Sequence, residues 1–291
     1  MLKYRLFFGA LMTAFFTAVV IFDGWLDGSL TASRADDKAA QGIIFSILTA
    51  AIIIKAHFEF SKLAAAKGLK IFTSVSLICS LLLASSSYWM AFVRMSPKIC
   101  LLLLGALVFS ALLLYQYIRY GTSGVIANCG ANCFSIVYLG VLSSFVLGIR
   151  IDFGVWPLLM FVFAVKIADI GAYAIGGLLG SHKFSPRISP AKTWEGMAGA
   201  LATGIAVAVL FAKCCDIMDW LPAVAFGFLC GFAGLCGDLV ESMLKRDAEQ
   251  KDAANNVPGF GGVLDIIDSP LLAAPFAYLF LMFAKGSVAL H

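Results

Sequence analysis

Four polar residues stand on one face of an otherwise apolar helix near the end of the chain. Asp238, Glu241, Ser242 and Lys245 are spaced i, i+3, i+4 and i+7, and leucine, valine and methionine fill the rest of the turn. A solvated helix end with i, i+4 ion pairs has the same spacing. Asp238, however, lies against a long apolar run, where charged groups are costly and usually functional. We therefore interpret the stripe as part of an active site.

Two further carboxylates follow the stripe at i, i+3 spacing. Asp265 and Asp268 begin the last apolar run, and a turn of sequence PGFGG, residues 258–262, precedes them. Carboxylates together with substrate phosphate oxygens are the usual ligands of Mg²⁺, and bare backbone N–H groups of a glycine turn suit phosphate oxygens. A plain connecting loop and acidic residues that complement a helix dipole are the alternatives. No GxxxxGK[ST] motif is present, so the turn is not a P-loop.

A second polar segment has basic residues and hydroxyls instead. Lys166 and Asp169 fall inside an apolar run, and the sequence SHKFSPRISPAKTWEG, residues 181–196, follows. Its prolines predict a shaped loop. The loop offers cations and hydroxyls of the kind that grip a polyphosphate, namely Lys183, Arg187, Lys192, Ser185, Ser189 and Thr193. A basic loop beside a membrane is also an ordinary sign of the cytoplasmic side.

The rest of the chain must hold these segments at a membrane. Of 291 residues, 61% are hydrophobic and only 13% charged, whereas soluble domains have about 25% charged residues. Apolar runs of near-spanning length predict an all-α, polytopic membrane protein with about nine spans. We place these spans at 6–22, 43–60, 71–90, 99–118, 132–149, 155–178, 197–213, 221–240 and 270–285. The first is read as an uncleaved helix and not as a signal peptide.

The basic residues predict the orientation. Twelve of the 21 lysines and arginines fall in segments on the N-terminal side of the membrane and seven on the other side. This bias places the N-terminus, and both polar segments, in the cytoplasm. The net charge of +4 is small and gives no reason to expect a nucleic-acid partner. The eight cysteines form no CxxC pair, which argues against a zinc site or a disulfide framework.

At this point the residues resemble a known family. The pattern S-x2-KR-x4-KD-x5-PG-x-GG-x2-D-x2-D, from Ser242 to Asp268, is similar to the signature of the phosphatidate cytidylyltransferases, and DIGAY (169–173) and SPRISPAKTWEG (185–196) resemble their other shared segment. The resemblance covers about 160–270. It implies a Mg²⁺-dependent membrane enzyme that transfers CMP from CTP to phosphatidic acid, giving CDP-diacylglycerol and pyrophosphate in phospholipid biosynthesis at the cytoplasmic face of the inner membrane.

The resemblance also assigns roles to residues. It implies that Asp238 and Asp265 hold the metal, with Asp268 beside them. The remaining catalytic and substrate-binding residues that we expect are Lys245, Arg246, Asp169, Lys183, Arg187, Ser189, Lys192, Thr193, Glu195, Ser242, Lys251, Asp252, Gly261 and Gly262. The chain departs from the family at Phe260 and Ile266, where His and Arg are usual. We expect those two side chains to be auxiliary; the alternative is a divergent enzyme with altered lipid preference.

We expect residues 1–155 to form a region of simple membrane helices and residues 156–291 to form the catalytic region. A homodimer is left open. Other classes remain as alternatives: a polyprenol kinase or another lipid-phosphate cytidylyltransferase, and a secondary transporter that uses Lys166, Asp169 and Asp238 as an ion path. The clustering of polar groups toward one side of the membrane favours the enzyme.

Overall fold

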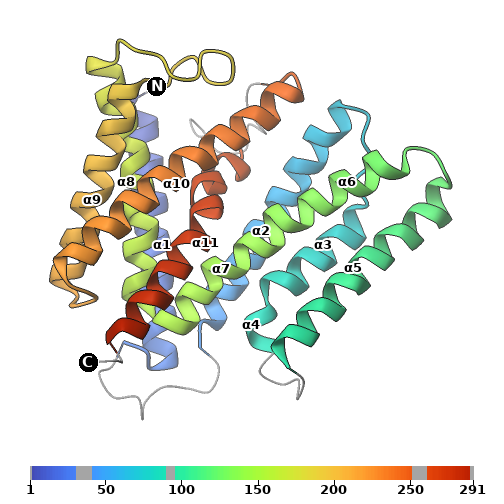
Figure 1. Cartoon of the computed structure of the whole chain (residues 1–291), viewed down its shortest axis with the longest axis horizontal. Coiled ribbons are helices and arrows are strands. Elements are labelled where there is room, and N and C mark those ends of the chain that lie inside the picture. The colour runs from blue at the N-terminus through green and yellow to red at the C-terminus, as the bar shows by residue number, and fades with distance from the viewer. Residues whose placement is uncertain (1, 31–40, 90–95, 251–260, 289–291) are drawn as a thin grey trace.

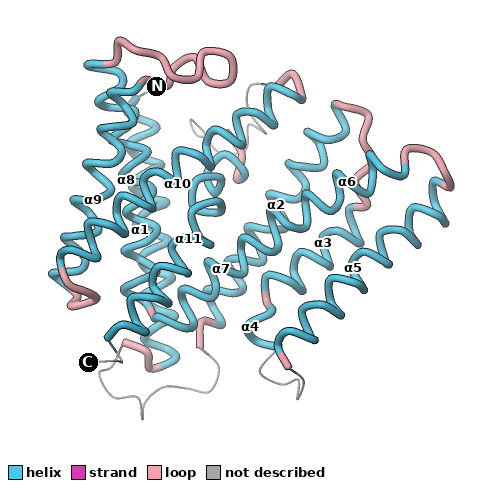
Figure 2. Tube along the Cα trace, viewed as in Figure 1, coloured by secondary structure: helices cyan, strands magenta, loops and turns pink. Residues whose placement is uncertain are grey.

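The computed structural model describes residues 2–30, 41–89, 96–250 and 261–288, and helices dominate all four segments (Figure 2). The described residues contain no β-strand, only an isolated bridge between Lys183 and Thr193. The helices are α1 (Leu2–Asp27), α2 (Ile43–Ala66), α3 (Thr73–Ala84), α4 (Ser86–Trp89), α5 (Pro97–Tyr120), α6 (Val125–Ser135), η2 (Ile136–Val141), α7 (Leu142–Gly148), η3 (Ile149–Phe153), α8 (Val155–Leu179), α9 (Trp194–Cys214), α10 (Trp220–Asp247) and α11 (Leu264–Val288), of which η2 and η3 are π-helical.

Eight of the described helical runs are long and apolar enough to cross a membrane. The prediction of an all-α polytopic membrane protein with about nine spans is therefore confirmed. The predicted span 71–90 is not among these eight runs, because its helix is shorter than expected. Its helix α3 has 12 residues, a rise of about 18 Å against a hydrocarbon core of about 30 Å. It ends at Ala84, where the serine run 85–87 begins.

The predicted span 132–149 is longer than expected. A continuous helical run covers Val125–Phe153 and changes to π-helix at η2 and again at η3. At Gly140 the run touches α3 closely, because a Cβ there would lie 2.7 Å from the Cα of Ser80. Such π-helical turns redirect the side chains that follow and are frequent near functional sites.

The helices form two groups that meet along α10 and α11 (Figure 1). In one group α8 packs against α1, α9, α10 and α11, and in the other α2, α3, α5 and α6 pack side by side. The largest buried core surrounds α8, with Leu158, Phe161 and Val165 at its centre. Small residues allow close packing here: Gly204 and Gly227 bring α9 and α10 into backbone contact.

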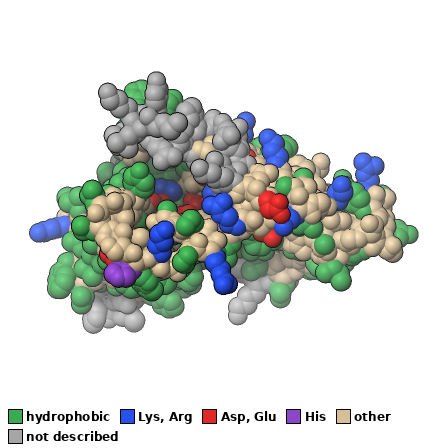
Figure 3. Space-filling view, turned by 90° about the horizontal axis from the view of Figure 1, so that it is seen from above, with side chains coloured by type: hydrophobic (Ala, Val, Ile, Leu, Met, Phe, Trp, Pro, Cys, Tyr) green, Lys and Arg blue, Asp and Glu red, His purple; other side chains and the backbone are tan. Residues whose placement is uncertain are grey.

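The two polar segments lie at the same end of the bundle. The loop between α8 and α9 and the end of α10 both lie at the top of Figure 1, and the Nε of Arg246 donates to the carbonyl of Ile188 at 3.3 Å. Seen from this end, lysine and arginine side chains are spread along the face, and acidic side chains lie among them (Figure 3). This is the arrangement that the sequence predicts.

A buried ionic cluster lies at the opposite end. The guanidinium of Arg150, in η3, bonds Asp23 at 2.9 Å and Asp27 at 2.7 Å. Arg150 is fully buried, and the two carboxylates are 2% and 5% exposed. Arg150 is one of the seven basic residues that we place on the outer side. It is an internal link there between α1, η3 and the start of α2, since Asp23 also accepts the N–H of Ile44.

Candidate active site

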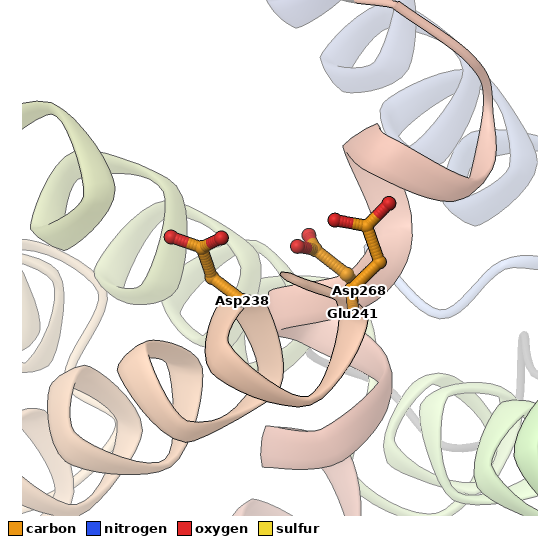
Figure 4. A group of neighbouring side chains, drawn as sticks. All are labelled: Asp238, Glu241 and Asp268. Carbon is orange, nitrogen blue, oxygen red and sulfur yellow. The ribbon is translucent and has the colours of Figure 1, made fainter. Parts of the chain in front are cut away.

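Three carboxylates meet where α10 and α11 cross. Asp238 and Glu241 extend from α10 and Asp268 from α11, toward the same side of the crossing (Figure 4). One oxygen from each lies within 4.8 Å of the others. Glu241 and Asp268 are buried, whereas the side chain of Asp238 is 41% exposed. The group therefore has a buried side and an open side.

A glycine makes this crossing possible. Gly237 directly precedes Asp238, and a Cβ built on it would lie 2.7 Å from the carbonyl oxygen of Asp268 and 2.9 Å from the Cα of Ser269. The backbones of α10 and α11 could not approach this closely with any larger residue. The close contact is what brings the carboxylate of Asp268 to those of α10.

Two lysines are paired with the carboxylates. The Nζ of Lys245 lies 2.6 Å from Glu241 and 2.9 Å from Asp265, one helical turn ahead of Asp268 on α11. The Nζ of Lys192 lies 2.9 Å from Asp238 and donates to the carbonyl of Leu235 at 3.3 Å. Each lysine thus holds a carboxylate in place and brings positive charge to the group.

Helix α8 contributes a third charged pair. Lys166 and Asp169 form an ion pair at 3.2 Å. The hydroxyl of Ser269 links this pair to α11, since it donates to Asp169 at 3.4 Å and to Asp268 at 3.3 Å. The predicted residue Asp169 therefore borders the carboxylate group.

The loop between α8 and α9 is folded back so that Lys192 reaches α10. Its base is closed by backbone hydrogen bonds from Phe184 to Lys192 and from Trp194 to His182. Thr193 caps α9 by accepting the N–H of Gly196 at 3.1 Å. Glu195 is engaged within the loop base, where its carboxylate lies 2.6 Å from the Nδ1 of His182.

Other predicted residues lie at varying distances from this centre. The Ser242 hydroxyl donates to Asp238 at 3.4 Å, and Arg246 is exposed at the end of α10. Within the described residues, no ion pair joins Lys183 or Arg187 to the carboxylates; both are exposed on the loop, which also contains Ser189. Lys251, Asp252 and Phe260 lie outside the described residues.

A backbone N–H group of the glycine turn before α11 donates a hydrogen bond to another residue of the protein. Gly261 has φ 91°, a value that favours glycine. The N–H of Gly262 donates to Asp265 at 2.6 Å. Ile266, the residue that departs from the family pattern, is partly buried on α11. The turn therefore fixes Asp265 in addition to any contact with a substrate.

Three polar residues near this centre have no catalytic, substrate-binding or metal role among the predictions from the sequence. Glu241 belongs to the polar stripe, and its i+3 spacing from Asp238 indicates that the two carboxylates share a helix face. Glu59, on α2, accepts the N–H of Leu264 at 2.8 Å. Tyr138, on η2, has a buried hydroxyl with no hydrogen-bond partner among the described residues, and it belongs to the same buried cluster as Leu264 and Leu271 of α11. No local pattern in the sequence connects α2 or η2 with this site.

The residues present fit a divalent cation. Five acidic side chains, those of Asp169, Asp238, Glu241, Asp265 and Asp268, lie beside three paired lysines, so the acidic groups outnumber the basic groups that pair with them. Oε1 of Glu241 is buried and has no hydrogen-bond partner among the described residues. Buried anionic oxygens of this kind require a compensating charge or donor. The oxygen-only donor set is the one that Mg²⁺ prefers.

Comparison of the sequence with known proteins identifies the family to which the chain belongs. The model of the cytidylyltransferase family matches residues 38–284. The chain belongs to the cytidylyltransferase family. The phosphatidate cytidylyltransferase of Synechocystis sp. is 30% identical over an alignment of 273 positions, which covers 83% of this chain and 89% of that protein.

Shorter matches are found with other phosphatidate cytidylyltransferases. The protein of Chlamydia pneumoniae is 34% identical over 183 residues, and that of Bacillus subtilis is 33% identical over 178 residues. These alignments span 59% and 66% of the two relatives, so the chain covers less than two thirds of either. The family model, which matches residues 38–284, covers α2 with Glu59, all of α8 to α10 and most of α11.

Proposed function

We propose that this member of the cytidylyltransferase family transfers CMP from CTP to phosphatidic acid, giving CDP-diacylglycerol and pyrophosphate for phospholipid synthesis. The observation that carries the proposal is the group of Asp238, Glu241 and Asp268, bordered by Lys192 and Lys245, at one end of a membrane bundle. Excess carboxylate suits a cation, and the lysines suit phosphate oxygens. An end of the bundle is where a water-soluble nucleotide and a lipid headgroup can meet.

The chemistry asks for alignment and charge neutralisation. An oxygen of the lipid phosphate bonds to the α-phosphorus of CTP, and the bond from that phosphorus to the pyrophosphate oxygen breaks. The lipid phosphate is already an oxyanion near neutral pH, so no general base is needed. Lys192 and Lys245, held by Asp238 and Glu241, would neutralise charge on the phosphates, and the exposed Arg246 would meet the departing pyrophosphate.

Mg²⁺ is the cofactor that we propose. Asp238, Glu241 and Asp268 would hold it, and when bound it would neutralise charge on the reacting phosphate oxygens. The resemblance assigns Asp265 to the metal together with Asp238. In the structure Asp265 bonds Lys245 and Gly262 instead, so its role as a ligand stays a prediction.

Transfer of label from CTP into extractable lipid tests the proposal. Purified protein in detergent micelles is given phosphatidic acid, Mg²⁺ and CTP labelled on either the α- or the γ-phosphate. We expect lipid label only from the α-position, and only when phosphatidic acid and Mg²⁺ are both present. Lipid label from the γ-position would identify a lipid kinase. A protein that turns over no CTP but carries solutes into liposomes would identify a transporter.

We further propose that the site faces the cytoplasm of the cell membrane. The support is the excess of lysine and arginine in the segments at that end of the bundle. CTP does not cross membranes, so sealed vesicles of known orientation test the point. Inverted vesicles should incorporate label from added CTP, whereas right-side-out vesicles should do so only after they are permeabilised. The reverse result would place the site on the outer face.

A further inference from the structure

Glu59 is a buried carboxylate in the first half of the chain. It lies on α2 and is 2% exposed. A carboxylate in such a position is costly unless hydrogen bonds compensate it. One bond is long-range in sequence: Oε2 accepts the backbone N–H of Leu264 at 2.8 Å. Leu264 is the first residue of α11, so the carboxylate of one helix meets the N-terminus of another.

This contact provides a cap that the local sequence lacks. The first N–H groups of a helix have no partner within the helix, and a negative charge near them is stabilising. Gly261, Gly262 and Val263 directly precede α11, and none of them has a side chain that can accept a hydrogen bond. Glu59 supplies the acceptor from outside α11.

The same carboxylate shapes the glycine turn. Gly262 is buried, and a Cβ built on it would collide with the carboxylate of Glu59. On its other side, Gly262 donates its N–H to Asp265 at 2.6 Å. The turn is therefore enclosed between Glu59 and Asp265, and the position of one restricts the other.

A short chain of contacts then leads to the three carboxylates. Asp265 lies 2.9 Å from the Nζ of Lys245, and the same Nζ lies 2.6 Å from Glu241. Asp268 follows Asp265 by three residues, on the first turns of α11. A displacement of the start of α11 would move Asp265 and Asp268 relative to α10, and misplacement of about 1 Å can lower a rate about a hundredfold.

We propose that Glu59 is a positioning residue of the site. By accepting the N–H of Leu264 it fixes the start of α11, and with it the placement of Asp265 and Asp268 against α10. It acts through these residues and does not touch the reacting atoms. The catalytic part of this inference rests on the proposed function, while the capping part does not.

Three variants test the proposal: Glu59→Ala, Glu59→Gln and Glu59→Asp. Alanine removes the acceptor, glutamine keeps an acceptor oxygen at the same reach, and aspartate is one methylene shorter. We expect kcat for CMP transfer to fall about ten- to a hundredfold in the alanine and aspartate variants. The glutamine variant should keep most of the kcat of the parent protein. KM for CTP should stay within about twofold throughout if Glu59 acts only through the start of α11.

A matched control comes from the same helix. Thr49→Ala removes a buried hydroxyl of α2 whose hydrogen bond among the described residues is to the carbonyl of Phe45, one turn earlier, and it should leave kcat unchanged. Each variant is assayed well below its own unfolding temperature. A glutamine variant as slow as the alanine variant, or an alanine variant with the normal rate, would overturn the positioning role.

Hydrogen–deuterium exchange tests the cap without using catalysis. Peptides that cover residues 261–270 should exchange faster in the alanine variant than in the parent protein and close to normally in the glutamine variant. Unchanged exchange in the alanine variant would overturn the cap. If the parent protein fails to transfer CMP, the proposed function is wrong, and the exchange result still decides whether Glu59 holds α11.

Discussion

The acidic residues of the site differ in what surrounds them. Asp238 is partly exposed and forms an ion pair with Lys192. Glu241 and Asp268 are both buried. Asp265 accepts hydrogen bonds from Lys245 and from the backbone N–H of Gly262. Residues of one chemical type therefore have separable tasks. A mutation at any of them should lower activity, but for different reasons.

Replacement of Asp265 by asparagine should lower CMP transfer roughly a hundredfold or more, while the protein still inserts into the membrane. The variant loses the charge that holds Lys245 beside Glu241. Label transfer from CTP measures the loss. Asp247→Asn is a matched control on the same end of α10, because Asp247 is 74% exposed and its 3.5 Å pair with Lys67 lies at the surface, where ion pairs contribute little. A normal rate of CMP transfer for the Asp265 variant would contradict a role of Asp265 in the active site.

The Mg²⁺ concentration that gives half-maximal activity separates the two roles of Asp265. Loss of a metal ligand raises that concentration, as we expect for Asp238→Asn and Asp268→Asn. If Asp265 also holds the metal, its variant will show the same rise. If it only anchors Lys245, its maximal rate will fall with an unchanged Mg²⁺ requirement.

At the scale of elements, the site depends on a few close approaches between helices. The Gly237 contact joins α10 to α11, the folded loop brings Lys192 to Asp238, and Glu59 joins α2 to α11. These contacts bring together residues from 59 to 268 of the chain.

The sequence predicts the local part of this arrangement and not the rest. Helical spacing shows that Asp238 and Glu241 share a face, and apolar length finds the spans, because both depend on neighbouring residues alone. The contact of Glu59 with Leu264 spans 205 positions, and no period or motif in a single sequence encodes it. Helix α3 ends at Ala84, directly before the serine run 85–87, and the run Val125–Phe153 changes to π-helix at η2 and η3. The length of an apolar run does not predict either feature.

Replacement of Gly237 by alanine should separate α10 from α11 at the site. Its Cβ would lie 2.7 Å from a backbone oxygen of α11, and neither backbone can move aside without shifting Asp268. We expect at least about a tenfold loss of CMP transfer. Gly105→Ala on α5 is the control, since no described atom outside the neighbouring backbone of α5 lies within 4 Å of a Cβ there and alanine favours a helix. Equal activity of the two variants would show that the helices tolerate the separation.

The whole molecule separates a reactive end from a stabilising end. Carboxylates and lysines near the loop between α8 and α9 form the candidate site, and the Arg150 cluster at the other end joins α1, η3 and the start of α2. Helix α2 takes part in both. From Ile43 to Glu59 it rises about 24 Å, so the end that is held by Asp23 is well separated from the end that caps α11.

Arg150→Met should therefore reduce stability far more than it reduces catalysis. The substitution leaves the carboxylates of Asp23 and Asp27 buried without their partner, a change that costs about 3–5 kcal/mol in other buried pairs. Thermal unfolding in detergent should occur at a clearly lower temperature, while kcat of the folded protein at low temperature stays within about twofold. Lys285→Met is the control, because Lys285 is exposed and makes only surface contacts among the described residues, with the carbonyl of Asp152 at 3.0 Å and with the ring of Phe153 at 5.5 Å. It should change neither quantity. A stable Arg150 variant that has lost activity would show that the two ends are coupled through α2.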